Sequence, residues 1–138
     1  MPPTYQLDDT PTRAELIELY DAVGWTAYTR EPDRLAAAVA GSAAVATARD
    51  SGRLVGLARV VGDGHTIAYL QDILVAPSHR RRGIAGELFR RVLAPFAHVR
   101  QQVLITDDEP GQRAFYEAMG FRAAHELEHP VRAFVRFS

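Results

Sequence analysis

Three stretches of strand-forming residues, separated by short turns that contain glycine, run through the middle of the chain. They cover residues 43–49, 54–61 and 66–75, with turns at 50–52 and 62–64. Because such short connections join antiparallel neighbours, we expect these stretches to form a three-stranded meander. Pro77 has no amide hydrogen for a neighbouring strand, so the third strand should end before it.

Helical patterns lie on both sides of this meander. A short strand is expected at residues 5–7, and Thr12 with Glu15 fits a capping box at the start of a helix that runs to Gly24. A second helix is expected from about Pro32 to Ala40, after an irregular connection at residues 24–29. Apolar residues at a spacing of four along 84–96 predict an amphipathic helix that follows the meander.

The remainder of the chain alternates short elements. Residues 103–105 predict a buried strand, residues 110–120 a short helix, and residues 123–127 and 131–137 a last hairpin turned at His129 and Pro130. The order β-α-α-β-β-β-α-β-α-β-β predicts an α/β (α+β) fold. In this fold, about four helices flank one mixed, mostly antiparallel sheet.

Length and charge narrow the classes of protein. A chain of 138 residues predicts a single domain over 1–138. A net charge of −1, from 16 basic and 17 acidic residues, argues against a nucleic-acid partner. No apolar run approaches the roughly 18 residues of a membrane span, and the first residues lack a signal-peptide pattern. We therefore expect a cytoplasmic protein without a membrane partner.

Two residue types are missing from the chain. It has no cysteine, which excludes a thiolate nucleophile and a cysteine metal cluster. It has no lysine either, which excludes Schiff-base chemistry and the P-loop lysine. Because the histidines show no metal-ligand spacing, no metal is expected.

The segment His79–Gly86 places three arginines before a glycine-rich helix start. Unpaired N–H groups at a helix N-terminus attract anions, and small residues let a phosphate approach the backbone. Arg80, Arg81 and Arg82 add positive charge at the same place. The segment therefore predicts a pyrophosphate site, although a solvated basic turn before a surface helix would have the same charges.

Residues 74–85, LVAPSHRRRGIA, resemble the acetyl-CoA-binding signature of the GNAT N-acetyltransferase superfamily. Arg80, Gly83 and Ala85 fill the fixed positions of that signature. Residues 114–121, AFYEAMGF, resemble a second motif of the family, Phe-Tyr-x-x-x-Gly-Phe. The two motifs follow each other at the family's spacing, and the expected order of elements matches the family over essentially the whole chain.

The resemblance implies a splayed sheet in which the strand at residues 66–75 parts from the strand around Leu104, with acetyl-CoA as the cosubstrate in the opening. The pyrophosphate would lie on the amides of residues 81–86, the pantetheine arm along residues 73–75, and the acetyl oxygen near the N–H of Ile73 or Leu74. The implied cofactor-binding residues are Ile73, Leu74, Val75, Arg80, Arg81, Arg82, Gly83, Ile84, Ala85, Gly86 and Tyr116.

The same resemblance implies direct attack of a primary amine on the thioester in a ternary complex. This route agrees with the absence of cysteine and of a Gly-x-Ser-x-Gly elbow. Tyr116 is the candidate general acid for the departing thiolate, unless it only packs beside Phe115. Asp72 is a tentative base, with binding to an arginine or capping of a turn as the alternative.

Other positions bear on the acceptor. Trp25 and Tyr28 lie where the family borders its acceptor pocket, although ordinary core packing would equally explain them. Asp107, Asp108 and Glu109 stand where many relatives carry asparagine, and the simpler expectation is a solvated loop that caps the helix at Pro110. The identity of the amine is not encoded in any motif.

Alternatives to an N-acetyltransferase of small amines stay open at this point. They are a non-catalytic CoA-binding or sensor domain of the same fold, an acetyltransferase for a protein amine, and a phosphate or nucleic-acid binder that uses the arginines. Dimers are common in the family, and nothing in the sequence decides between a monomer and a homodimer.

Overall fold

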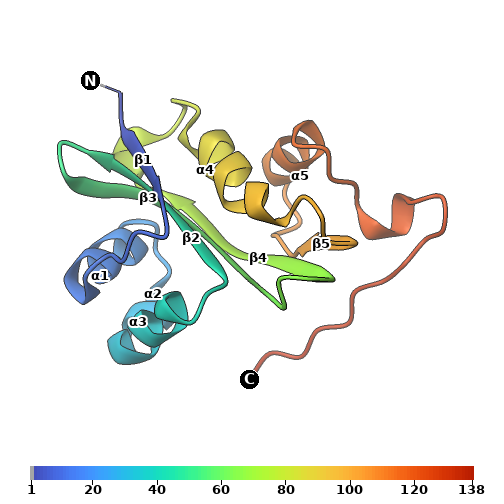
Figure 1. Ribbon diagram of the computed structural model, residues 1–138, viewed down its shortest axis with the longest axis horizontal. Helices are drawn as coiled ribbons and strands as arrows, with labels where there is room; N and C mark the ends of the chain where they lie inside the picture. Colours follow the sequence, from blue (N-terminus) through green and yellow to red (C-terminus); the bar gives the residue numbers. More distant parts are fainter. Residues whose placement is uncertain (1) are drawn as a thin grey trace. The chain divides into compact units, whose positions relative to one another are not determined.

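A five-stranded sheet in the order β1-β2-β3-β4-β5 organises the first part of the computed structural model, which describes residues 2–138 (Figure 1). The strands are β1 (Thr4–Leu7), β2 (Ala44–Asp50), β3 (Arg53–Gly62), β4 (Ile67–Val75) and β5 (Gln101–Leu104). The chain divides into two compact units, residues 2–105 and Thr106–Ser138, which we describe separately. The single-domain organisation stays a prediction.

The expected meander is confirmed. Strands β2, β3 and β4 pair antiparallel, β1 joins β2 antiparallel, and β5 pairs parallel with β4. The sheet is therefore mixed and mostly antiparallel, as the sequence predicts. Val103 and Leu104 are only half-buried and Ile105 is 47% exposed, so the expectation that residues 103–105 form a buried strand was wrong. The reason is that β5 is the last strand of the sheet.

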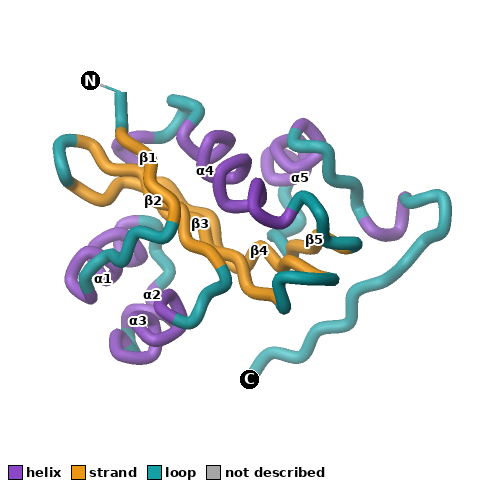
Figure 2. The backbone as a smooth tube through the Cα atoms, in the orientation of Figure 1, coloured by secondary structure: helices purple, strands orange, loops and turns teal. Residues whose placement is uncertain are grey.

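Helices cover both faces of this sheet (Figure 2). Helices α1 (Arg13–Ala22), α2 (Thr26–Thr29) and α3 (Pro32–Ala40) lie on one face, and α4 (Ile84–Leu93) packs across β2, β3 and β4 on the other. The connection at residues 24–29 was expected to be irregular, but it contains α2. A single helical turn has too few residues to show a periodic pattern, which is why the sequence did not indicate it.

Helix α4 approaches the sheet closely at Gly56. A Cβ atom there would lie 2.9 Å from Leu88 Cδ1 and 3.2 Å from Ile84 Cγ2, below ordinary contact distances. The apolar side of α4 is buried, as its spacing predicts, and a short 3-10 turn at Ala94–Phe96 follows it. The absence of a side chain at Gly56 therefore sets the distance between α4 and β3.

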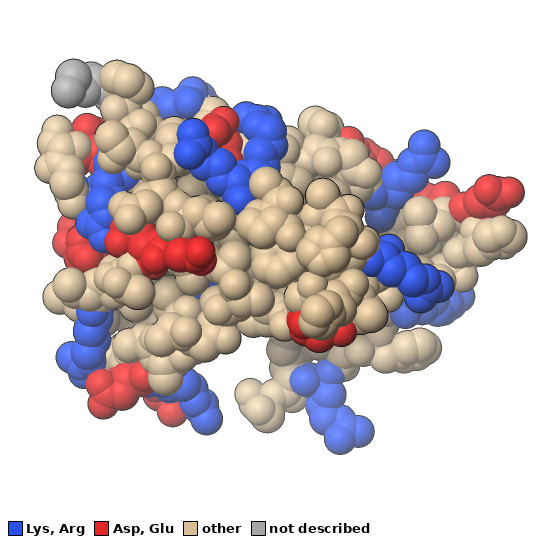
Figure 3. All heavy atoms as spheres, viewed as in Figure 1, with Lys and Arg blue, Asp and Glu red and all other residues tan. Residues whose placement is uncertain are grey.

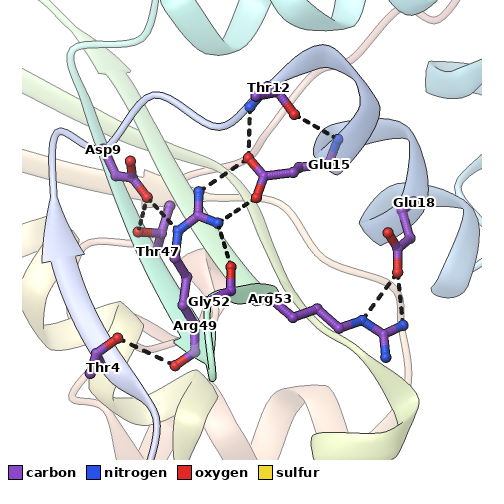
Figure 4. Close-up of polar contacts among 9 residues, drawn as sticks. All are labelled: Thr4, Asp9, Thr12, Glu15, Glu18, Thr47, Arg49, Gly52 and Arg53. Carbon is purple, nitrogen blue, oxygen red and sulfur yellow. Dashed lines mark hydrogen bonds and ion pairs between the residues drawn. The ribbon is translucent and has the colours of Figure 1, made fainter.

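A polar cluster ties the start of α1 to β2 (Figure 4). The predicted capping box is present: Glu15 N–H donates to Thr12 Oγ1 at 3.1 Å, and Thr12 N–H donates to Glu15 Oε1 at 2.9 Å. Arg49 on β2 binds the Glu15 carboxylate and also donates from Nε to Asp9 Oδ2 at 2.9 Å. The cluster fixes the β1–α1 connection against the sheet.

The second unit contains α5 (Pro110–Ala118) and a 3-10 turn at Ala124–Glu126. The predicted hairpin at 123–127 and 131–137 was wrong, because neither segment forms a strand. Glu126 N–H donates to Ala123 O at 2.9 Å, so the 3-10 turn uses backbone groups that a ladder would have needed. Val131 N–H then donates to Ala124 O at 3.1 Å, and the residues after it form neither a helix nor a strand.

Candidate functional site

Strand β4 has a free edge where its pairing with β5 ends. The parallel ladder runs from Ile67 opposite Gln101 to Leu70 opposite Leu104 and stops there. On its other side, β4 stays paired with β3 as far as Val75 opposite Gly56. Within residues 2–105, the segment 71–75 is therefore paired with a strand on one side only. We call this segment the open edge of β4, and it gives the sheet the predicted splay.

A β-bulge marks the start of the open edge. Val60 lies opposite Leu70 but Arg59 lies opposite Asp72, so Gln71 is an extra residue in the ladder. Tyr28 Oη donates to Asp72 Oδ1 at 2.9 Å, and Gln71 Nε2 donates to Tyr28 Oη at 3.4 Å. Two consecutive side chains of a regular strand point to opposite faces, whereas a bulge lets both reach one partner.

The arginine-rich segment forms an exposed turn before α4. Arg81 has φ 64° and Gly83 has φ 77°, so two left-handed residues lead into the first helical residue, Ile84. Arg80, Arg81 and Arg82 are exposed, and none forms an ion pair with any residue in 2–138. Because the N-terminal N–H groups and these charges share one place, the turn is suited to an anion. We call residues 80–86 the anion loop.

The residue before the anion loop is tied to the β2–β3 hairpin. His79 Nε2 lies 2.8 Å from Asp50 Oδ2, and His79 Nδ1 lies 2.7 Å from Ser78 Oγ. The hydrogen bond with His79 lowers the pKa of Asp50. The loop is thus anchored through the residue that precedes it, and its arginines are left to meet a ligand.

The open edge and the anion loop adjoin each other. Val75, the last residue of the open edge, lies opposite Gly56 on β3. A Cβ atom on Gly56 would lie 3.2 Å from Ile84 Cγ2, so Ile84, the first residue of α4, packs next to Gly56. The predicted cofactor residues of the first unit, 73–75 and 80–86, are therefore brought together at one end of β4.

Asp72 lies in a buried polar cluster rather than at the surface. Its Oδ2 accepts a hydrogen bond from Arg59 Nε at 2.6 Å and one from Tyr20 Oη at 3.0 Å. The side chains of Arg59 and Asp72 are 7% and 3% exposed. The alternative for Asp72, that it binds an arginine, is what the geometry shows. A role as base stays a prediction.

The electrostatics of this cluster follow from its burial. Burial raises the pKa of Tyr20, and the charge of Asp72 raises it further. Burial raises the pKa of Tyr28 as well. Burial by itself would lower the pKa of Arg59, but the charge and hydrogen bond of Asp72 outweigh it and the pKa is raised. Both tyrosines thus stay protonated, and their hydroxyl groups donate hydrogen bonds to the carboxylate of Asp72.

Trp25 and Tyr28 form an aromatic group with Tyr20. The ring of Tyr20 lies edge-on to both, with centroids 5.9 Å from Trp25 and 5.2 Å from Tyr28. Tyr20 is fully buried, Tyr28 is half-buried, and Trp25 is 36% exposed. The rings of Trp25 and Tyr28 therefore combine core packing with a surface that a ligand could contact.

Tyr116 belongs to the second unit. It lies on α5, half-buried, with its ring edge-on to Phe115 at a centroid distance of 5.0 Å. Burial raises the pKa of Tyr116, and a hydrogen bond with the Thr106 side chain acts in the opposite direction. The role of Tyr116 as general acid stays a prediction.

The acidic residues before α5 include the cap of that helix. Glu109 is the N-cap residue, and its carboxylate accepts from the N–H groups of Gly111 at 2.9 Å and Gln112 at 3.1 Å. Asp107 and Asp108 are exposed. The expected solvated capping loop is confirmed.

A family model for the acetyltransferase (GNAT) domain matches residues 14–134. The chain belongs to the GNAT acetyltransferase family. A GNAT family acetyltransferase from Streptococcus pneumoniae is similar at 29% identity with a TM-score of 0.83, covering 99% of each chain. A comparison with curated protein sequences found no match.

Two aminoglycoside acetyltransferases share the GNAT fold at lower identity. AAC(6')-Iy, solved with the bisubstrate analogue CoA-S-monomethyl-acetylneamine, is 18% identical with a TM-score of 0.73, covering 99% of this chain and 98% of that one. A second, from an uncultured soil metagenomic sample, is 20% identical with a TM-score of 0.70 and full coverage of both chains. At these identities the likeness concerns the fold alone.

Arg59 and Tyr20 are the residues of this GNAT site that the sequence analysis missed. Arg59 lies inside the apolar run of β3, and Asp72 lies inside that of β4. Two opposite charges in the apolar parts of neighbouring hairpin strands were a usable signal of a cross-strand pair. Tyr20 gave no such signal, because its spacing fits the buried face of α1 equally well.

No group of three or more histidine, aspartate or glutamate side chains suited to a metal occurs in residues 2–138. Over the same residues, no helix has the length and apolar character needed to cross a membrane. On the face drawn in Figure 3, acidic and basic side chains are interspersed rather than gathered by sign.

Proposed function

We propose that this GNAT domain is an acetyl-CoA-dependent N-acetyltransferase that acetylates a small primary amine by direct attack. The observation that carries the proposal is that the open edge of β4 adjoins the anion loop. The loop offers backbone N–H groups and three unpaired arginines to a pyrophosphate. The open edge offers unpaired backbone groups to an amide-containing arm, as an added strand would use them.

The reaction balances without an acyl-enzyme. The amine nitrogen attacks the thioester carbonyl carbon, a C–N bond forms, and the C–S bond breaks. The amine loses one proton, and coenzyme A leaves as a thiol after taking one. A backbone N–H of the open edge near Ile73 or Leu74 would stabilise the oxyanion, worth about 3 kcal/mol.

Tyr116 would supply the proton to the departing sulfur. Its raised pKa keeps the phenol protonated at neutral pH, which a general acid requires. The acceptor amine would lie against Trp25 and Tyr28, because their partly exposed rings suit a cation before it loses its proton. The bisubstrate analogue in AAC(6')-Iy supports a fold in which CoA and an amine meet directly.

The first test is binding of acetyl-CoA, measured by thermal shift and by calorimetry. Ligand at about 100 times its dissociation constant should stabilise the wild type by about 2.7 kcal/mol. Gly83→Glu and Gly83→Gln both force a side chain onto φ 77°, with no atom within 4 Å of the new Cβ, so they share the same strain. They differ only in charge.

Acetyl-CoA affinity should fall much further in Gly83→Glu than in Gly83→Gln. No binding to the wild type at millimolar acetyl-CoA would refute the proposal. If acetyl-CoA binds, release of free thiol with a panel of primary amines tests turnover. Binding without turnover over a broad panel would favour a non-catalytic CoA-binding domain instead.

A further inference from the structure

The cluster around Asp72 lies where the pairing of β4 with β5 ends and its register with β3 shifts. The bulge at Gln71 directly follows Leu70, the last residue of β4 that pairs with β5. Asp72 directly follows the bulge, and its carboxylate binds β3 through Arg59, α1 through Tyr20 and α2 through Tyr28. Three elements therefore hold the first residue after the bulge.

The bulge decides which backbone groups the open edge presents. In a strand, successive residues direct their N–H and C=O groups to opposite sides, so a slip by one residue exchanges the groups that face each neighbour. If the bulge closed and Gln71 paired opposite Arg59, every later residue of β4 would shift by one, and the groups of 73–75 that now face the open edge would face β3. The side chains of Ile73 and Val75 would also move to the other face of the sheet.

The cluster is closed, which argues against Asp72 as the proton acceptor. Oδ2 accepts from Arg59 and Tyr20, and Oδ1 accepts from Tyr28. Arg59 also donates from Nη1 to Ala38 O and to Ser42 Oγ, both at 3.4 Å. No buried side-chain nitrogen or oxygen lacks a partner in the part of the chain described. A proton taken up by Asp72 would leave the buried guanidinium of Arg59 without its counter-charge, which is costly.

We propose that Asp72 is a positioning residue, which with Arg59, Tyr20 and Tyr28 holds the bulge at Gln71 and thereby sets the backbone groups that the open edge of β4 presents to acetyl-CoA. The inference rests on the proposed function. It assigns Asp72 to binding of the cosubstrate rather than to proton transfer from the amine. The two roles differ in a measurement that needs no acceptor.

The test is the dissociation constant of acetyl-CoA alone, measured by calorimetry at a temperature where each variant is folded. Asp72→Asn and Arg59→Gln should each weaken binding about tenfold, because each leaves one partner of the pair uncompensated. The double variant should bind no more weakly than either single variant, because the pair acts as one unit. A general base that only meets the amine would leave this constant unchanged.

Asp9→Asn is the matched control. Asp9 accepts from Arg49 Nε at 2.9 Å through Oδ2 (Figure 4). Asp72 likewise accepts from Arg59 Nε at 2.6 Å, and the side chain of Asp9 is 16% exposed. Asp9 lies on the connection before α1, and its hydrogen-bond partners are on β2, not on β4. Asp9→Asn should lower the melting temperature and leave acetyl-CoA binding unchanged.

Each outcome is decisive. Wild-type affinity in Asp72→Asn would overturn the inference and leave the proposed function standing. Equal weakening in Asp9→Asn would overturn it too, since the effect would then follow from stability alone. No binding to the wild type would refute the proposed function itself. If Asp72→Asn does not fold, Tyr28→Phe removes a single hydroxyl from the cluster, and it should weaken binding about threefold.

Discussion

Leu70 and Asp72 are two residues apart on β4, yet their side chains enter opposite faces of the sheet. Leu70 lies opposite Val60, whereas Asp72 lies opposite Arg59, the neighbouring residue on β3. In a regular strand, residues i and i+2 share a face. The bulge at Gln71 thus places an aspartate on the face covered by α1 and α2, beside the tyrosines that bind it, instead of beneath α4.

The close approach of α4 to the sheet predicts the effect of Gly56→Ala. The new Cβ would lie 2.9 Å from Leu88 Cδ1, and because Leu88 is fully buried, its displacement would disturb the packing around it. We expect a loss of about 1–3 kcal/mol in the free energy of unfolding, measured with urea. Gly86→Ala, whose Cβ would meet its nearest atom at 3.5 Å, should instead gain about 0.5–1 kcal/mol.

A double variant tests the cause. Leu88→Ala removes the atom that the new side chain of Gly56→Ala would strike. The double variant should therefore lose less free energy of unfolding than the two single variants lose together, by about 0.5 kcal/mol or more. Additive losses would show that crowding against Leu88 is not the reason.

The pair of Glu15 with Arg49 predicts a loss of stability in acid. The hydrogen bond from Arg49 lowers the pKa of Glu15 from its ordinary 4.5 to about 2. A lowered pKa adds stability above pH 4.5, and that stability is lost as the pH falls from 4.5 to about 2. Glu15→Gln, which retains the capping geometry, should cost about 1–2 kcal/mol at pH 7.

Urea unfolding at pH 7, 4, 3 and 2 measures this difference. The gap between the wild type and Glu15→Gln should close as the pH approaches 2. Glu18→Gln is the control, because Glu18 pairs with Arg53 between side chains 60% and 65% exposed, and it should change little at any pH. A gap that persists at pH 2 would contradict the role of the ion pair.

Tyr116→Phe should lower kcat much more than it weakens acetyl-CoA binding, because phenylalanine keeps the ring and loses only the hydroxyl. General acids contribute about a hundredfold or more, so a loss of about a hundredfold is expected. Burial raises the pKa of Tyr116, so loss of the phenol proton should not lower the wild-type rate until the pH exceeds the ordinary tyrosine pKa of about 10. Steady-state kinetics with an amine that the enzyme acetylates measure both the loss in kcat and the pH dependence.

The matched control for Tyr116 is Tyr5→Phe. Tyr5 lies on β1, with the Arg91 guanidinium 4.9 Å from its ring centroid, and it is not among the predicted site residues. The kcat of Tyr5→Phe should equal that of the wild type. Unchanged kcat in Tyr116→Phe would show that the phenol only packs beside Phe115.

The unpaired arginines of the anion loop predict a salt-dependent affinity. Arg80→Gln with Arg82→Gln should change the free energy of unfolding by less than about 0.5 kcal/mol, since neither side chain has an ionic partner in residues 2–138. Acetyl-CoA affinity should fall, and its dependence on ionic strength should become shallower.

A variant with the same change in charge is the control for the anion loop. Arg34→Gln with Arg53→Gln removes two exposed arginines that pair with Glu31 and Glu18. It should leave the affinity and its salt dependence as in the wild type. Equal effects of the two double variants would indicate a general effect of net charge.

Local patterns in the sequence were sufficient for most elements. The turns at 50–52 and 62–64 fixed the meander, Thr12 and Glu15 the start of α1, and the spacing of apolar residues the face of α4. The hairpin expected at 123–137 failed, because its alternating apolar residues indicate strand propensity but not a partner, and no strand pairs with them in residues 2–138.

The anion loop and the open edge could be predicted because each is one continuous segment whose function depends on its own backbone. Small residues and cations before a helix were enough to locate the anion loop, whereas the cofactor role of residues 73–75 was implied by the resemblance to the GNAT family. The role of Asp72 could not be predicted in this way. Its partners come from β3, α1 and α2, and its face of the sheet depends on one extra residue in β4. Pairing between distant segments is decided only when the sheet and its helices pack together.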